Sequence, residues 1–517
     1  MQTWMVRVAL GSTCAVAAAI AGCASVNPRP DYQRAAEHVR RSAGVERLFD
    51  PEQLEADARY IDECLSDGLT AEEAARVALL NNVELQAALY DIGAARADLV
   101  QAGLLSNPSL GVALRLPSAG GLANIDFDLA QNIAELWQIP VRKRAAERGL
   151  DATILAVARL ATETAASART AYYGAAGANR RLEIARENLD VGQKVLELTE
   201  FRRQAGAGSE LDVNLARGVL LEAELAVKNA RLAADSARRA LATVLGVSLD
   251  ADELVLAEDL PEPPAHLFDE RLLTAIAWDE RLDARALRQS VQGAREQLVL
   301  QMRRVFPNVS LGLAFERDAR PRAQGRDILA DTARASIAAG RLTAPEIESR
   351  SARGVDTDFI IGPLLSLELP VFDQNQAQIA KARFTLEQRV RVLEGLGRTI
   401  HQEVREAVDQ AQTAWEVARF YRDELVPQVS RSLELSRESY RAGQSSILSV
   451  LDAERSYLAA RDRYAEAMQL AAAAAPLVER TIGLPFEHLL EEMRRRPPEP
   501  TPTTRPAGPE SAERTEP

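Results

Sequence analysis

The chain has 517 residues, of which 26% are charged and only 5% aromatic, and its formal net charge is −13. The acidic balance, without a basic stripe that carries interleaved aromatic residues, argues against nucleic acid as a partner. There is no G-x-S-x-G sequence and no P-loop, and the four histidines lie far apart in the chain, with no cysteine or carboxylate at ligand spacing. We therefore expect no enzyme, no metal site and no cofactor.

The N-terminus predicts export. Residues 1–22 combine an early positive charge with a short apolar run and small residues before Cys23, which is typical of a secretory signal rather than a spanning helix. The sequence I-A-G-C resembles the bacterial lipoprotein cleavage box, which implies that Cys23 is the lipidated first residue of the mature chain. Ala24 follows it, and the lipoprotein sorting pattern then implies the outer membrane. The alternative is an ordinary signal peptide with a chance cysteine.

Helical sequence opens each half of the chain. After a polar leader and a charged helical stretch over 23–66, Thr70 and Glu73 have the spacing of a capping box. The pattern predicts one helix from there to about Leu105, where Asn107-Pro108 ends it. The second half repeats this arrangement with a helix over 272–305.

Both halves then change to a period of two, which predicts strands. The first half has a hairpin at about 108–131 with its tip over 117–124, and the second has strands at about 308–316 and 357–370. A polar loop rich in glycine and arginine, over 317–357, separates the second pair. The apolar positions of these strands are Leu110, Val112, Leu114, Leu116, Ile125, Phe127, Leu129, Leu311, Leu313 and Phe315. The charged positions are Arg115, Asp126, Asp128, Glu316, Asp358 and Glu368.

Four strands with one apolar face favour a shared membrane barrel. Two hairpins cannot leave their sheet edges bare in lipid, and a barrel in a membrane has at least about eight strands. Several copies of the chain must then share one barrel, with the apolar positions facing lipid and the charged positions facing the lumen. The alternative is a small soluble sheet packed beneath a loop.

Very long helices follow each strand pair. The pattern stays helical over 137–201 and 374–441, which at 1.5 Å per residue corresponds to about 95 Å each. We expect Pro427 to be the one interior proline of these two helices and to kink its helix. Return helices are expected over 209–245 and 446–482. The first carries a heptad seam made mostly of alanine, which predicts close helix packing: Val219, Ala223, Ala226, Ala230, Ala233, Ala237, Ala240 and Val244.

The chain contains one unit written twice. At a constant offset, Gly206 corresponds to Gly443 and Ser209 to Ser446, and in both places Gly should end one helix while Ser caps the next. The duplication predicts two structural repeats, over 67–246 and 271–483, with sharp tips at about 203–212 and 440–449. A connector over 247–270 joins the repeats, and residues 484–517 end in a Pro-rich tail that we expect to be disordered.

Together these motifs resemble those of the TolC-type outer-membrane efflux protein family over nearly all of the mature chain. The resemblance is carried by the opening D-G-L-T-A-E-E-A-A-R-V-A-L-L-N-N-V-E-L, by the run from Tyr421 to Gly443, and by the tips A-G-A-G-S-E-L-D-V and A-G-Q-S-S-I-L-S-V. It implies a mainly α fold with a transmembrane β part, in which three chains form a 12-stranded β-barrel continued by a periplasmic α-helical barrel. The leader, the connector and the C-terminal segment would form an equatorial region around the helices.

The resemblance also implies a periplasmic gate. Carried over by position, Asp212 and Tyr440 form a pair that resembles the family's tip tether, and Ser449 and Asp452 fall where the family often has acidic rings. A ring of one Asp452 per subunit would favour cations. The alternative for each residue is a solvated polar side chain at a helix start.

Serine at 449 departs from the family pattern, as does Ser445, which stands where the family can have a basic tether residue. The closed tip is then either weaker or held by other residues, among which Glu210 and Arg441 are candidates.

The function implied is a passive exit duct in the cell outer membrane, anchored in its lipid through Cys23. Its partners would be two further copies, a periplasmic adaptor and an inner-membrane pump, and its cargo small toxic compounds such as drugs or metal ions. One alternative is the outer-membrane component of a type I protein secretion system. An alternative of another class is a periplasmic adaptor or a structural coiled-coil lipoprotein.

Overall fold

The structure is a computed structural model that describes residues 25–49, 54–116, 123–248, 253–264, 269–305, 308–321, 326–345 and 355–495. The expected signal, Cys23, the first hairpin tip and the Pro-rich tail from 496 onward lie outside the described residues. The chain divides into two compact units. The strand unit comprises 1–26, 96–149 and 290–390, and the helix unit comprises 27–95, 150–289 and 391–517.

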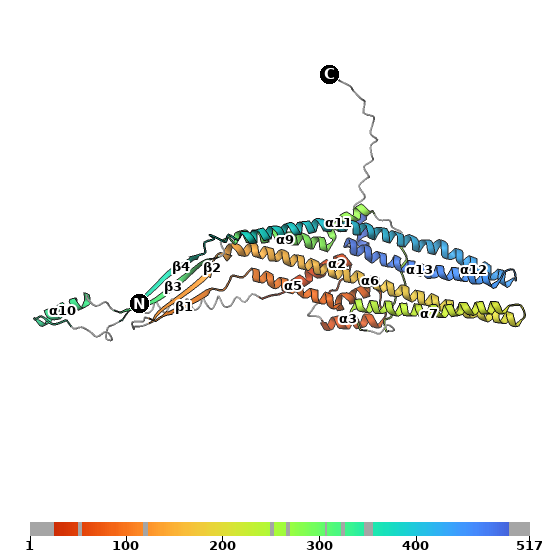
Figure 1. Ribbon diagram of the computed structural model, residues 1–517, viewed down its shortest axis with the longest axis horizontal. Helices are drawn as coiled ribbons and strands as arrows, with labels where there is room; N and C mark the ends of the chain where they lie inside the picture. The colour runs from red at the N-terminus through yellow and green to blue at the C-terminus, as the bar shows by residue number, and fades with distance from the viewer. Residues whose placement is uncertain are drawn as a thin grey trace, which may run out of the picture. The chain divides into compact units, whose positions relative to one another are not determined.

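The strand unit contains one antiparallel sheet in the order β1-β2-β3-β4 (Figure 1). Its strands are β1 (Ser109–Arg115), β2 (Asn124–Asn132), β3 (Val309–Pro321) and β4 (Val355–Leu367). The register places Leu110 opposite Leu129, Leu129 opposite Leu313, and Leu313 opposite Pro363. Because side chains alternate between the faces of a strand, this register gathers the apolar positions on one face, as the period of two predicts.

The second hairpin differs from its expected form. β3 and β4 each have 13 residues and pair as far as Pro321 with Val355, so each strand takes up one end of the predicted loop over 317–357. That loop also contains a helix, α10 (Arg326–Ala339). The sequence A-D-T-A-R-A-S-I-A-A has high helix propensity, a signal that the glycine and arginine content of the whole loop obscured.

Four helical segments gather below the sheet in the strand unit. They are the end of α5 (Val83–Ala102), the start of α6 (Glu135–Gln204), most of α9 (Leu282–Arg303) and the start of α11 (Gln376–Phe420). The Arg142 guanidinium donates to the carbonyl oxygens of Ala102 and Leu104. The Asn375 amide donates to the Gln301 carbonyl oxygen at 2.6 Å. These hydrogen bonds tie the start of α6 to the end of α5, and the segment before α11 to the end of α9.

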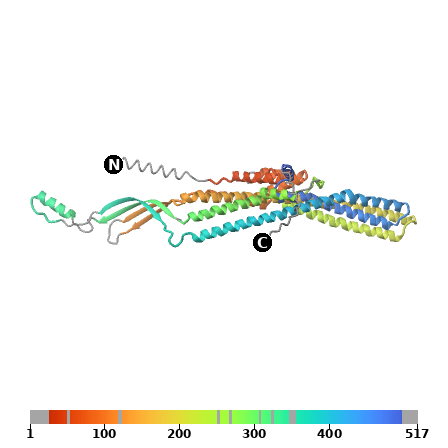
Figure 2. The same ribbon diagram turned by 90° about the horizontal axis from the view of Figure 1, so that it is seen from above.

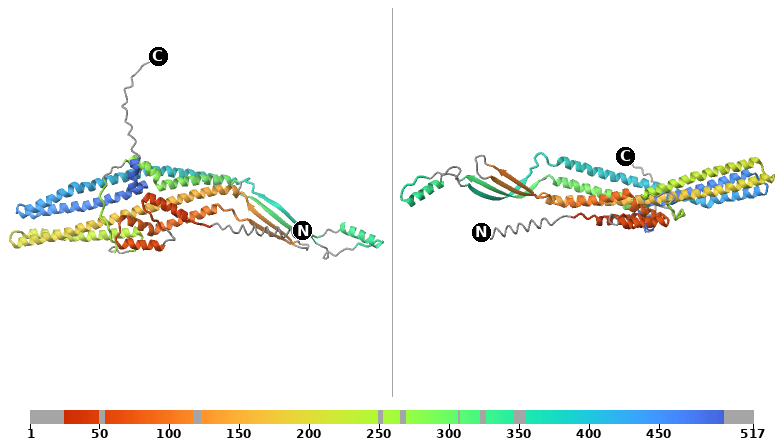
Figure 3. Two further views of the ribbon diagram at one scale, coloured as in Figure 1. Left: turned by 180° about the vertical axis from the view of Figure 1, so that it is seen from behind. Right: turned by 90° about the horizontal axis from the view of Figure 1, so that it is seen from below.

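The helix unit contains two long antiparallel hairpins, seen edge-on in Figure 2 and from behind in Figure 3. The first joins α6 to α7 (Glu210–Leu245), and the second joins α12 (Val426–Arg441) to α13 (Ile447–Ile482). The shorter helices are α2 (Arg29–Ala43), α3 (Leu54–Ser66), α4 (Ala71–Asn81), α8 (Glu270–Glu280) and α14 (Phe486–Arg495). Thr70 and Glu73 form the expected capping box at the start of α4.

The first helix of each repeat is broken, where a single helix was predicted. α4 and α5 are separated by Asn82 with ψ of 115°, and α8 and α9 by Arg281 with ψ of 126°. At each break the glycine that ends a return helix packs closely: Gly246 lies against Asn81, and Gly483 against Arg281. Both glycines have a positive φ, in the left-handed region. This backbone conformation favours glycine. At each break, the C-terminal end of a return helix that is distant in sequence therefore packs against the chain.

The long helices also differ from expectation around proline. Pro427 follows a π-helical segment, η1 (Tyr421–Leu425), in which the Val426 N–H donates to the Tyr421 carbonyl. The wider turn accommodates a residue that cannot donate to the carbonyl four positions earlier. Pro427 is moreover not the one interior proline, because Pro140 lies inside α6 and Pro476 inside α13.

The helix unit has two main core clusters, one built mostly from the first repeat and one from the second. One cluster surrounds Tyr172, whose hydroxyl accepts from the Glu258 N–H at 3.0 Å, and another surrounds Trp415, whose indole donates to the Ala471 carbonyl. The predicted alanine seam is displaced: Ala226, Ala233 and Ala240 are exposed, whereas positions one residue further on, such as Ala234 and Leu241, are buried. Leu241 belongs to the Tyr172 cluster, which sets the rotation of α7.

Candidate functional site

The sheet exposes a continuous apolar face. Leu110 is 68% exposed and Ile361 69%, although both are large aliphatic residues that a soluble sheet would cover. Phe127, Phe315 and Phe359 form a row across three strands with ring centroids 6.1 and 5.9 Å apart. The remaining exposed residues of this face are Val112, Leu114, Leu129, Leu311, Leu313, Leu365 and Leu367.

The opposite face of the sheet carries the charged residues. Arg115 forms an ion pair with Asp126 at 2.6 Å, and the register places Asp126 opposite Glu316 and Asp318 opposite Asp358. Directly opposed like charges destabilise an isolated sheet. By this register Arg115, Asp126, Glu316 and Asp358 share one face of the sheet.

Two further expected lumen residues have distinct settings. Asp128 lies over Gly111, where an added Cβ would come within 2.3 Å of its carboxylate, so glycine leaves room for the acid. Glu368 follows β4, and its N–H donates to the Asn308 carbonyl at 3.2 Å.

The two hairpin tips have the same backbone turn. Gly206 and Gly443 have φ of 75° and 73°, and equivalent backbone hydrogen bonds close both turns, from Ala207 to Arg202 and from Gln444 to Ser439. This is the left-handed glycine ending that the sequence predicts. The duplication therefore extends to the hydrogen bonds of the turn.

The caps that follow the two turns differ. Ser209 and Asp212 form a reciprocal capping box at the start of α7. Ser446 makes no side-chain cap, contrary to expectation; instead the Ser449 hydroxyl donates to the Ser446 carbonyl at 2.7 Å. Asp452 is exposed one turn further along α13. Asp212 and Ser449 thus both take part in local hydrogen bonds, whereas Asp452 faces outward.

Tyr440 lies between the hairpins rather than on the surface. It is 8% exposed and packs with Ile447, Val450 and Leu451. The Arg202 guanidinium lies over its ring at 4.3 Å from the centroid, and its Nη1 donates to the Tyr440 carbonyl at 3.4 Å. The structure brings Tyr440 together with Arg202, while Asp212 bonds to Ser209. The sequence offered no pattern that singled out Arg202, because its partner lies on the other repeat.

Ion pairs connect the two hairpins along their length. Arg181 of α6 makes a bidentate contact with Asp462 of α13, at 2.8 and 3.0 Å. Closer to the short helices, Arg169 is 7% exposed and bonds to Glu479 of α13 at 3.0 Å and to Glu72 of α4 at 2.8 Å. α13 is therefore fastened to α6 by charged groups at two levels.

α7 leaves a stripe of leucines bare. Leu211, Leu225 and Leu232 lie seven or fourteen residues apart and are 65%, 58% and 65% exposed, and Leu221 lies on the same side. A heptad spacing of leucine is typical of a surface that packs against another helix. We name these four residues the α7 stripe.

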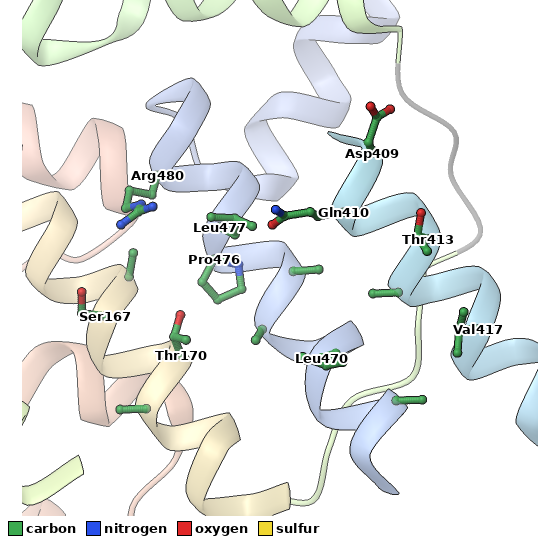
Figure 4. A pocket seen from close by; sticks show the side chains of 16 residues that line it. Ser167, Thr170, Asp409, Gln410, Thr413, Val417, Leu470, Pro476, Leu477 and Arg480 are labelled. Carbon is green, nitrogen blue, oxygen red and sulfur yellow. The ribbon is translucent and has the colours of Figure 1, made fainter. Parts of the chain in front are cut away.

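The helix unit also has an apolar recess between α6, α11 and α13, with a volume of about 840 Å³. Pro476 and Leu477 lie at its centre between Thr170 and Gln410, while Arg480 lies toward one side (Figure 4). Most of its remaining lining is alanine. The recess holds no nucleophile beside a base, and so it offers no arrangement for covalent or acid–base catalysis.

Two searches of the described residues give negative results. Across the ranges that the structure describes, no three histidine, cysteine or acidic side chains come close enough to hold a metal ion. Among the same residues, no helix combines the length and the apolar content of a membrane span.

Comparison with known proteins identifies a matching family and related proteins. A family model described as outer membrane efflux protein matches residues 74–247 and 274–483. The cobalt-zinc-cadmium resistance protein CzcC of Cupriavidus metallidurans is 22% identical over 427 residues, which cover 80% of this chain and 90% of that protein. The outer membrane protein OprJ of Pseudomonas aeruginosa is 26% identical over 407 residues, covering 74% and 77%.

Solved structures share the fold. The outer-membrane channel OprN aligns with a TM-score of 0.60 at 20% identity, over 86% of this chain and 95% of that one. The outer membrane protein VceC of Vibrio cholerae aligns with a TM-score of 0.58 at 18% identity, over 84% and 97%.

Proposed function

This chain belongs to the outer membrane efflux protein family, and from that premise we propose that three copies of it form one passive exit duct across the outer membrane. The family accounts for the absence of a catalytic arrangement, because an efflux channel is not an enzyme. In the proposed assembly each copy supplies four strands to a twelve-stranded barrel, and the long helices continue the duct into the periplasm.

The observation that carries this proposal is the sheet. β1 and β4 are its edges, and neither has a second neighbour among the described strands. An unpaired edge beside an exposed apolar face is unstable in water and not permitted in lipid. Pairing β4 of one copy with β1 of the next would satisfy both edges and close the sheet.

The α7 stripe supports the same assembly at the level of the helices. Its leucines have no partner among the described residues of their own chain that covers them, and burying a leucine stabilises a structure by about 1.5–3 kcal/mol. A helix of a neighbouring copy is the occupant that the proposal assigns to it.

The tips would form the regulated end of the duct. We assign Tyr440, with Arg202, to holding the two hairpins of one copy together, and Asp212, Ser449 and Asp452 to the polar surface that lines the closed end. A periplasmic adaptor would separate the tips, and an inner-membrane pump would supply the energy, because a passive channel has no source of its own.

Cationic cargo fits the charges best. The polar sheet face carries Asp126, Asp128, Glu316 and Asp358, and acidic linings favour cations in pores. The name of CzcC refers to resistance to cobalt, zinc and cadmium ions, which is consistent with this charge, whereas the name of another relative refers to export of pyoverdine. We propose metal ions or basic drugs as the cargo.

The barrel is tested by placing the same charge on either face of one strand. Leu365→Arg puts a guanidinium on the apolar face of β4, which in lipid costs about 2–4 kcal/mol near the bilayer centre. Ser366→Arg, the neighbouring residue on the polar face, serves as the matched control. We expect the first variant to be depleted from outer-membrane fractions and the second to insert normally. Equal insertion of both would contradict a lipid-facing sheet.

Assembly is tested on the full chain with the anchor removed. Cys23→Ser should still require detergent for extraction and should have the mass of three chains by light scattering. A water-soluble single chain would exclude the proposal of a trimeric duct. It would favour the alternative that the protein is a periplasmic adaptor or a structural coiled-coil lipoprotein.

A further inference from the structure

A basic cleft in the helix unit has no place in the duct mechanism. It lies between α2, α6 and α9, has a volume of about 760 Å³, and is lined among others by Arg34, His38, Arg285, Arg288 and Gln289. Its size falls in the range of pockets that bind small molecules, about 300–1,000 Å³. Of its ten lining residues, two are acidic.

The two acids of the cleft are already paired. Asp151 forms an ion pair with Arg34 at 2.5 Å, and Glu37 pairs with Arg40 at 2.7 Å. Behind the cleft, Glu280 of α8 pairs with Arg41 at 3.4 Å. Every carboxylate that faces this region therefore already has an arginine partner.

Arg285 and Arg288 remain without a carboxylate. Arg288 donates to the Trp278 carbonyl at 2.6 Å and lies over the Trp278 ring, which uses one of its N–H donors and leaves its charge without a carboxylate. Among the described residues, no ion pair or side-chain hydrogen bond of Arg285 is found. Two uncompensated guanidinium groups thus face the same half-buried space.

The titration of the neighbouring groups agrees with a positive local potential. Burial lowers the pKa of His38, and the charges of Arg285, Arg34 and Arg41 lower it further. Burial also lowers the pKa of Arg285; Glu280 opposes this effect, and Arg41 and Arg288 add to it. Burial would also lower the pKa of Arg34, but the hydrogen bond and charge of Asp151 and the charge of Asp31 raise it, and Glu37 opposes the lowering at His38. The surplus of positive charge is therefore on the Arg285 side of the cleft.

We propose that this cleft binds a phosphate-bearing anion between Arg285, Arg288 and His38. A planar guanidinium matches the paired oxygens of a phosphate, and the amide of Gln33, which also lines the cleft, can donate to a further oxygen. A single carboxylate would neutralise only one of the two free charges, whereas a phosphate can accept bonds from both sides of the cleft.

The phosphate can come from a lipid headgroup or from a soluble compound. α2 begins at Arg29, six residues beyond Cys23, so an acyl anchor at Cys23 would tether the cleft to the membrane by at most about 21 Å of extended chain. This reach makes an anionic phospholipid available to the cleft. The chemistry of recognition is the same for both sources.

The test uses the full chain in detergent with inorganic phosphate as the probe. Arg285→Gln should weaken phosphate binding roughly tenfold or more, because it removes a charge-assisted contact, and Arg285→Lys should recover part of the loss. Arg59→Gln, a change at an exposed arginine of α3, is the matched control and should bind as the unmodified chain does. Equal phosphate affinity of the unmodified chain and Arg285→Gln would overturn the proposal.

A second arm distinguishes the sources. The same three variants are placed in nanodiscs that mix phosphatidylglycerol with phosphatidylcholine, and bound lipid is counted by native mass spectrometry. Retention of phosphatidylglycerol that is lost in Arg285→Gln assigns the cleft to a lipid headgroup. Loss of phosphate binding without a change in retained lipid assigns it to a soluble phosphate compound.

A pH series separates direct binding from a structural effect. Sulfate does not titrate near neutrality, so any pH dependence of its binding reports the protein. Protonation of His38 adds a donor and a charge, and sulfate affinity should therefore rise as pH falls through the lowered pKa of His38. His38→Gln should flatten this profile; an unchanged profile would remove His38 from the site.

Discussion

The two return helices are equal in length and unequal in burial. α7 and α13 each have 36 residues and each end at a glycine in the left-handed region. α13 buries fifteen residues, whereas α7 buries six. Leu225 and Leu232 of the α7 stripe correspond to Asp462 and Gln469 of α13. The duplicated helix is thus polar where it meets α6 of its own chain and apolar where nothing in its own chain covers it.

The difference in burial and polarity between α7 and α13 indicates that the return helices of the two repeats pack against different partners. Asp462 satisfies Arg181 of α6, and the Gln469 side chain packs against Gly177 of the same helix. A leucine at position 462 would leave the Arg181 guanidinium without its partner, and a charge in the α7 stripe would prevent a helix from packing there. Each sequence fits a different neighbour, and for α7 we assign that neighbour to another copy.

The largest expected effect comes from a charge in the α7 stripe. Leu225→Glu should abolish the oligomer, because the carboxylate would have to be buried without a partner at every interface. Ala226→Glu places the same carboxylate on the next exposed residue, off the stripe, and should leave assembly intact. Light scattering of the purified chains gives the mass. A trimer in both variants would leave the stripe without a role in assembly.

The next effect concerns the fastening of α13. Arg169→Leu removes the charge that faces the buried Glu479, and breaking such a pair destabilises a protein by about 3–5 kcal/mol. Residue Ala242 of α7 corresponds to Glu479, so Glu479→Ala makes α13 resemble α7 at this position. We expect the double variant to unfold at a higher temperature than Arg169→Leu alone. A double variant that is the less stable of the two would contradict this account of the pair.

A smaller, pH-dependent effect is expected at the break between α8 and α9. Burial favours the neutral form of Asp283, but the Arg281 hydrogen bonds and charge outweigh it, so the pKa of Asp283 is lowered. A lowered pKa in the folded state means that this stabilisation is full above about pH 4, the unfolded value, and is lost as pH falls through the folded pKa.

Asp283→Asn should therefore lower the unfolding temperature at neutral pH and flatten its decline below about pH 4. Asp62→Asn, at an exposed aspartate of α3, provides the control. A decline in acid as steep as that of the unmodified chain would remove Asp283 as its source.

The smallest effect is expected at the tips. Arg202→Ala removes the cation–π contact with Tyr440, which is worth about 0.5–1 kcal/mol at a partly exposed site. That is enough to shift the balance between closed and open tips by a few fold, and we expect a higher open probability in planar bilayers. Arg186→Ala, at an exposed arginine farther along α6, is the control. Identical conductance of the two variants would exclude the contact from gating.

The candidate site was only partly accessible from sequence. The period of two placed Asp126 and Glu316 on one face because alternation is a property of a single strand. Arg202 and Arg285 could not be found in that way, because Arg202 meets a residue of the other repeat and Arg285 lines a cleft built from three helices. Their surroundings are created by contacts between segments far apart in the chain.

The sequence by itself determined the duplicated plan, the four strands, the capping box at Thr70 and the glycine turns at Gly206 and Gly443. Each of these depends on neighbours within a few residues, where backbone preference and side-chain period act directly. Tertiary structure decided the helix breaks at Asn82 and Arg281, the π-helical turn before Pro427, and which face of α7 is buried. Those features depend on which sequence-distant helix packs at each position. A local sequence pattern carries no information about such long-range packing.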